Sequence, residues 1–168
     1  MQNMDISLED PRWDAVDFDA LALAAVRATL TYLQVDWQTS EVSILACDDA
    51  RIATLNADFR DKPTPTNVLS WPSEERAAMS DGGMPEPPEP GPDGAIELGD
   101  IAIAYETCVA EATAHSKLLA DHITHLMVHA TLHLLGFDHE TTRDAALMEG
   151  LEVKILGKMG LNDPYRDS

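Results

Sequence analysis

The chain has 168 residues, and 30 acidic against 11 basic residues give it a formal net charge of −19. This length fits one domain, and an apolar content of 45% is too high for a disordered chain. The acidity argues against broad nucleic-acid binding, which depends on clustered Lys and Arg. No apolar run reaches the roughly 18 residues of a membrane helix, and the acidic N-terminus does not resemble a signal peptide. We therefore expect a cytoplasmic protein that does not bind membranes.

The N-terminal part of the chain alternates predicted strands with predicted helices. In 17–33 apolar side chains recur at helical spacing behind Asp17, which we expect to cap the helix. Apolar and polar residues alternate in 41–47, as in a half-buried strand. Patterns of this kind predict strands over 6–8, 41–47, 67–71 and 98–105, and helices over 17–33 and 48–59.

Residues 73–97 are predicted to form a long loop between the last two of these strands. The centre of this segment, 84–93, is rich in proline and glutamate and cannot hold a helix or a central strand. We expect a mobile acidic excursion from a single domain, and not a boundary between two domains.

The C-terminal part is predicted to be helical, with helices over about 106–120, over about 121–135 and from about 141 onward. Gly136 is a favoured residue for ending the second of these helices. Thr141 and Asp144 have the spacing of a capping box at the start of the third. Strands that are followed by such a helical half indicate an α+β fold, in which a small mixed sheet packs with about five helices.

Five of the six histidines lie between His122 and His139. Within this group, His129-Ala-Thr-Leu-His133-Leu-Leu-Gly-Phe-Asp-His139 has the spacing of metal ligands. Residues four apart share one helix face, and Gly136 lets the chain turn back so that His139 can join the first two imidazoles. Three imidazoles around one open position form the usual catalytic zinc site. We therefore expect one zinc ion per chain on His129, His133 and His139, at the end of a helix and in the turn that follows.

Residues near these histidines are candidates for supporting roles. His125 lies one helical turn before His129, and Asp138 and Glu140 flank the last ligand. We expect His125 and Asp138 to orient the ligands rather than to bind the metal, with proton transfer as the alternative for Asp138 and Glu140. The spacing equals that of metzincin proteases, whose general base directly follows the first histidine. Ala130 occupies that position and cannot transfer a proton, which favours a substrate with a better leaving group, such as a phosphodiester.

The chain resembles the YbeY family of bacterial endoribonucleases, which are rRNA maturation factors. The resemblance rests on 129–139 and on two earlier blocks, Asn56-Ala-Asp-Phe-Arg60 with Pro65-Thr-Asn-Val-Leu-Ser-Trp-Pro72, and Leu98-Gly-Asp-Ile-Ala-Ile103. It implies a zinc-dependent, single-strand-specific RNase of the bacterial cytoplasm. The family matures the 3′ end of small-subunit rRNA and takes part in ribosome quality control. The implied partners are rRNA and the pre-ribosomal small subunit, together with ribosomal proteins and assembly factors.

Arg60 matches an arginine that the family needs for activity. Because a guanidinium fork fits two phosphate oxygens, we expect Arg60 to bind the substrate phosphate, with Lys62 as a second cation beside it. Two alternatives stay open at this point. One is a metallopeptidase or another zinc hydrolase, against which Ala130 argues. The other is a non-catalytic assembly factor in which zinc only stabilises the fold and the acidic surface docks on basic ribosomal proteins.

Overall fold

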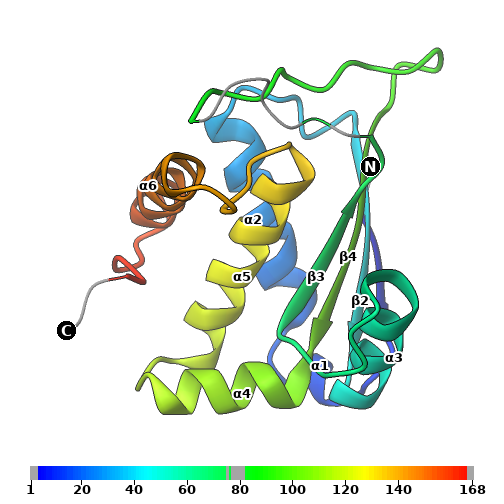
Figure 1. The fold of residues 1–168 in the computed structure, drawn as a ribbon, viewed down its shortest axis with the longest axis vertical. Helices are drawn as coiled ribbons and strands as arrows, with labels where there is room; N and C mark the ends of the chain where they lie inside the picture. Colours follow the sequence, from blue (N-terminus) through cyan, green and yellow to red (C-terminus); the bar gives the residue numbers. More distant parts are fainter. Residues whose placement is uncertain (1–3, 75, 77–81, 166–168) are drawn as a thin grey trace.

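The structure is a computed structural model that describes residues 4–74, 76 and 82–165. In this part of the chain four strands form one sheet, and six helices surround it (Figure 1). In chain order the elements are β1 (Met4–Leu8), α1 (Arg12–Ala15), α2 (Phe18–Tyr32), β2 (Ser40–Cys47), α3 (Asp49–Arg60), β3 (Val68–Pro72), β4 (Ile96–Ala104), α4 (Tyr105–Ala114), α5 (Leu119–Leu134) and α6 (Thr142–Lys158). None of these helices combines the length and hydropathy that a bilayer-spanning segment needs.

The sheet is mixed and has the strand order β1-β2-β4-β3. β1, β2 and β4 run parallel, whereas β3 lies at one edge and pairs with β4 in the antiparallel direction. The predicted α+β class with a small mixed sheet is thereby confirmed. Ser70 of β3 lies opposite Ile101, and Trp71 lies opposite Asp100. Since successive side chains of a strand point to opposite faces, Ser70 and Trp71 face opposite sides of the sheet.

Each face of the sheet has its own hydrophobic core. Ile44 and Ile101 belong to the larger core, together with the buried apolar side chains of α2 and α5. Ala102 lies on the other face and belongs to a smaller cluster with Ile52 of α3. Figure 1 shows this arrangement, with α2 and α5 on one side of the sheet and α3 on the other. Ser70 therefore faces α5, and Trp71 packs against the cluster under α3.

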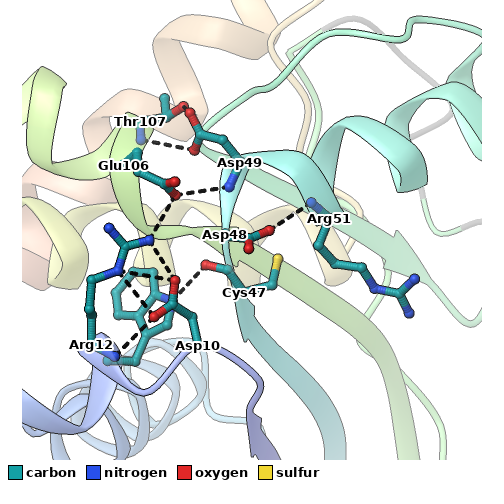
Figure 2. Close-up of polar contacts among 9 residues, drawn as sticks. Asp10, Arg12, Cys47, Asp48, Asp49, Arg51, Glu106 and Thr107 are labelled. Carbon is teal, nitrogen blue, oxygen red and sulfur yellow. Dashed lines mark hydrogen bonds and ion pairs between the residues drawn. The ribbon is translucent and has the colours of Figure 1, made fainter.

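A polar network fixes the start of α3 against the start of α4. The Asp49 carboxylate accepts hydrogen bonds from the backbone N–H and the hydroxyl of Thr107, at 3.0 and 2.8 Å. In return, the Asp49 backbone N–H donates to Glu106 over 3.0 Å. Arg12 forms ion pairs with Asp10 and Glu106, at 2.6 and 3.3 Å (Figure 2). Because α3 is held at its first turn, the position of its last residue, Arg60, is defined relative to the sheet.

α5 ends at the turn that the sequence predicts. Leu134 is its last residue, and Gly136 follows with a φ of +105°. A Cβ atom at Gly136 would collide with the backbone of Arg76, so both the φ angle and the space require glycine. Arg76 comes from the predicted acidic loop, and its guanidinium donates to the Leu134 carbonyl over 2.9 Å. One end of that loop is therefore attached to the turn after α5.

Other parts of the predicted loop are also placed by the structure. The Gly82 backbone N–H donates to the Asp144 carboxylate of α6 over 2.7 Å. β4 begins at Ile96, which moves the end of the loop from residue 97 to residue 95. Residues 75 and 77–81 of this loop lie outside the described residues, and the mobility of the segment stays a prediction.

Three local predictions are wrong. Asp17 occupies the N-cap position of α2, but its φ is +54° and its side chain makes no capping hydrogen bond. α4 ends at Ala114 instead of near residue 120, because the chain turns at Ser116 with a φ of +54°. The sequence analysis also missed α1, a four-residue helix that buries Trp13 and lets its indole N–H donate to the Cys47 carbonyl over 2.8 Å.

Candidate active site

His129 and His133 lie one turn apart on α5, and His139 follows the turn at Gly136. The rings of His129 and His139 have centroids 5.4 Å apart, at an interplanar angle of 33°. Burial lowers the pKa of His133, and the neighbouring His129 and His139 lower it further, against an opposing effect of Asp138. The fold thus brings the rings of His129 and His139 close together, with His133 one turn further along α5 and His139 exposed.

A buried glutamate of α6 holds the first of these histidines. The Nδ1 atom of His129 lies 2.8 Å from Oε2 of Glu152, whose side chain is fully buried. The other oxygen, Oε1, lies 2.7 Å from Nε2 of His125 and accepts a hydrogen bond from the Tyr165 hydroxyl. Burial raises the pKa of Glu152, but the hydrogen bonds from His125, His129 and Tyr165 outweigh this effect and bring it to about 2. Glu152 is therefore a carboxylate at neutral pH, and it fixes the ring of His129.

Ser70 of the edge strand β3 holds the second histidine. Its hydroxyl lies 2.8 Å from Nδ1 of His133. The lowered pKa of His133 keeps this ring neutral near pH 7, as a metal ligand must be. Ser70 is itself mostly buried, so this contact is protected from water.

These contacts are the ones expected around metal-binding imidazoles. A histidine ligand usually engages its second ring nitrogen with a carboxylate, carbonyl or hydroxyl, which sets the tautomer and the ring orientation. In His129 and His133 the Nδ1 atoms are engaged in this way, and Nε2 is left as the donor atom. Within the described residues, however, no group of three or more His, Cys, Asp or Glu side chains is arranged so that it could hold a metal ion. The donor chemistry fits a metal, and His139 is the side chain that packing fixes least.

Arg60 lies next to these histidines. It is the last residue of α3, and its Nη2 atom donates to the backbone carbonyl of Ser70 over 3.2 Å. Its charge also contributes to the lowered pKa of His133. Ser70 of β3 is therefore hydrogen-bonded to Arg60 through its backbone carbonyl and to His133 through its hydroxyl.

The other predicted residues lie at the margin of the site. Lys62 is exposed on the loop after α3, where its backbone N–H donates to the Asn56 carbonyl over 3.2 Å. The structure does not bring its side chain to the histidines. Asp138 accepts a hydrogen bond from the backbone N–H of His139 over 2.7 Å, which stabilises the turn. His125 reaches the site only through Glu152, and Glu140 is exposed at the start of α6.

Sequence reasoning assigned no function to Glu152, Ser70 or Tyr165. A signal for Glu152 was present, because this residue lies on the apolar face of α6, four residues after Met148 and three before Ile155. A carboxylate in such a row is buried and needs a partner. Ser70 and Tyr165 gave no comparable signal, since each is an ordinary polar residue far from the histidines in the chain.

Known proteins match this chain over nearly its whole length. Residues 4–160 match the family model described as Endoribonuclease YbeY. The protein named Endoribonuclease YbeY from Dinoroseobacter shibae is 62% identical over 162 residues, which cover 96% of this chain and 90% of that protein. The protein of the same name from Ruegeria pomeroyi is 57% identical, with 96% and 97% covered. The solution structure of TM1509 from Thermotoga maritima shares the fold, with a TM-score of 0.55 at 17% identity over 97% of this chain and 99% of that one.

Proposed function

Because this chain belongs to the YbeY endoribonuclease family, we propose that it is a metal-dependent endoribonuclease that cleaves single-stranded RNA. Its substrate is the immature 3′ end of small-subunit rRNA, and its place is the bacterial cytoplasm, in ribosome maturation and quality control. The observation that supports this proposal is the link through Ser70, whose carbonyl accepts a hydrogen bond from Arg60 and whose hydroxyl contacts His133. A metal ion and a neighbouring cation both stabilise the negative charge that develops on a phosphodiester during its cleavage.

We assign the metal to His129, His133 and His139 and propose that it is one zinc ion. Neutral imidazoles favour zinc among the common metals, and the Nδ1 contacts of His129 and His133 support this choice. When bound, zinc supplies a Lewis acid for hydrolysis. Glu152 and Ser70 hold two of the ligands in place, and Asp138 holds the backbone of the third.

Arg60 binds the scissile phosphate in this proposal. A guanidinium is a planar cation, and two of its N–H groups can contact two phosphate oxygens together. It therefore stabilises the negative charge that grows on the phosphate during cleavage. Lys62, two residues further along the exposed loop, adds positive charge to the approach of the RNA.

The net charge of −19 limits how the enzyme meets its substrate. A surface of this charge repels free RNA at long range, so binding depends on the few cations near the site. We therefore propose that the enzyme acts on pre-ribosomal small subunits, where basic ribosomal proteins and assembly factors contact its acidic surface.

The test is cleavage of an RNA that spans the immature 3′ end of small-subunit rRNA. We expect the purified protein to cut it, and we expect both a chelator and His133→Ala to abolish cleavage. Failure to cut both the free RNA and pre-ribosomal particles, by a folded protein with zinc bound, would instead identify an assembly factor. Chelation that unfolds the protein would show that the metal also has a structural role.

A further inference from the structure

Phe59 is an exposed aromatic residue next to Arg60. Its side chain is 65% exposed at the end of α3, whereas most large apolar side chains of the described chain are buried. Its ring contacts Trp71 of β3, with ring centroids 5.5 Å apart and an interplanar angle of 63°. Exposed aromatic rings that rest on a fixed aromatic partner are typical of binding surfaces.

The two rings line a cavity of about 390 Å³ on the α3 face of the sheet. Leu45 and Leu55 add apolar walls, and Asp5 and Asp100 add two carboxylates. The lining residues include no Lys or Arg, so the cavity itself repels a phosphate. It suits an uncharged planar group whose faces are apolar and whose edge carries N–H donors for these carboxylates.

The cavity and the proposed active site lie on opposite faces of the sheet and share the edge strand β3. Phe59 directly precedes Arg60, and Trp71 directly follows Ser70. Arg60 and Ser70 are hydrogen-bonded to each other, so both elements that form the cavity also reach the histidines. A nucleotide consists of an anionic phosphate and a flat base with an N–H edge. On one side of β3 Arg60 can bind the phosphate, and on the other side the cavity can bind the base.

We propose that Phe59 and Trp71 form a stacking subsite for one base of the RNA whose phosphate binds Arg60. The inference rests on the proposed function, which it deepens by assigning a base-binding position next to the phosphate. An apolar side chain of a protein partner would also fit the walls, but it has no N–H groups for the carboxylates of Asp5 and Asp100.

The test is binding of a fluorescein-labelled, single-stranded 2′-O-methyl RNA, which resists cleavage, measured by anisotropy. Stacking on an aromatic side chain predicts that Phe59→Ala weakens binding roughly 5- to 100-fold, whereas Phe59→Tyr changes it by less than about two-fold. Leu118→Ala is the control, because Leu118 is also apolar and 72% exposed but lies between α4 and α5. We expect it to bind like the wild type.

A second RNA with abasic sites in place of its bases separates stacking from a change in the fold. The wild type should lose affinity for this RNA, and Phe59→Ala should bind both RNAs equally weakly. Equal affinity of wild type and Phe59→Ala for the intact RNA would overturn the inference and leave the cavity as a surface for a protein partner. Because the assay needs no cleavage, Phe59-dependent binding without RNase activity would refute the proposed function alone.

Discussion

Removing the negative charge of Glu152 should weaken zinc binding although Glu152 is not a ligand. In Glu152→Gln the amide keeps the size of the side chain, but it carries no charge and has one acceptor oxygen instead of two. It can therefore no longer accept hydrogen bonds from both His125 and His129. Loss of such a supporting carboxylate lowers metal affinity by about 10- to 100-fold, which corresponds to about 1.4 to 2.7 kcal/mol.

Competition with a chromophoric zinc chelator measures this affinity directly. Glu41→Gln is the control, because it removes the same charge from an exposed glutamate of β2. We expect the control to bind zinc like the wild type. Circular dichroism of both variants should show folded proteins before the titration. Unchanged zinc affinity in Glu152→Gln would refute the assignment of His129 as a ligand that Glu152 orients.

Three further substitutions test the other parts of the site. Arg60→Ala should keep zinc bound but lower the rate of RNA cleavage by about 100-fold or more, as the loss of one charge-stabilising donor does in other enzymes; a wild-type rate in a cleavage assay would remove Arg60 from the mechanism. Ser70→Ala should weaken zinc binding about 10-fold, which calorimetric titration can detect, and an unchanged affinity would show that the hydroxyl does not support His133. Gly136→Ala should lower the free energy of unfolding by about 1 to 3 kcal/mol, because its φ is +105° and Arg76 blocks a Cβ; urea denaturation at an unchanged midpoint would contradict this.

The sequence predicts those parts of the site that lie close together in the chain. His129, His133 and His139 follow from helical spacing and a glycine, and in the structure the rings of His129 and His139 lie close together. Arg60 was identified only by family resemblance, because nothing in a single arginine of a loop shows which strand it will contact. Glu152 reaches His129 across 23 residues, and Ser70 reaches His133 across 63. Such pairs depend on how helices and strands pack, which local patterns do not reveal.

The fold shows the same division between local and distant effects. The four strands and the long helices were predicted because burial imposes a regular spacing on apolar residues. The end of α4 was misplaced because Ser116 adopts a positive φ, a conformation that a serine in the sequence does not indicate. α1 was missed because one turn is too short for any periodic pattern to appear.

The position of Arg60 at the edge of the sheet has a consequence for the solubility of the protein. The Ser73 N–H donates to Leu98 and the Ala104 N–H donates to Asn67, so in this antiparallel register the carbonyl of Ser70 points away from β4. An outward carbonyl on an edge strand is a template on which a strand of another molecule can add, and aggregation begins in this way. The Arg60 guanidinium covers that carbonyl with a charged group. Arg60, which we assign to catalysis, thus also shields the open edge of the sheet. The need to prevent strand pairing between molecules therefore constrains position 60 independently of RNA cleavage.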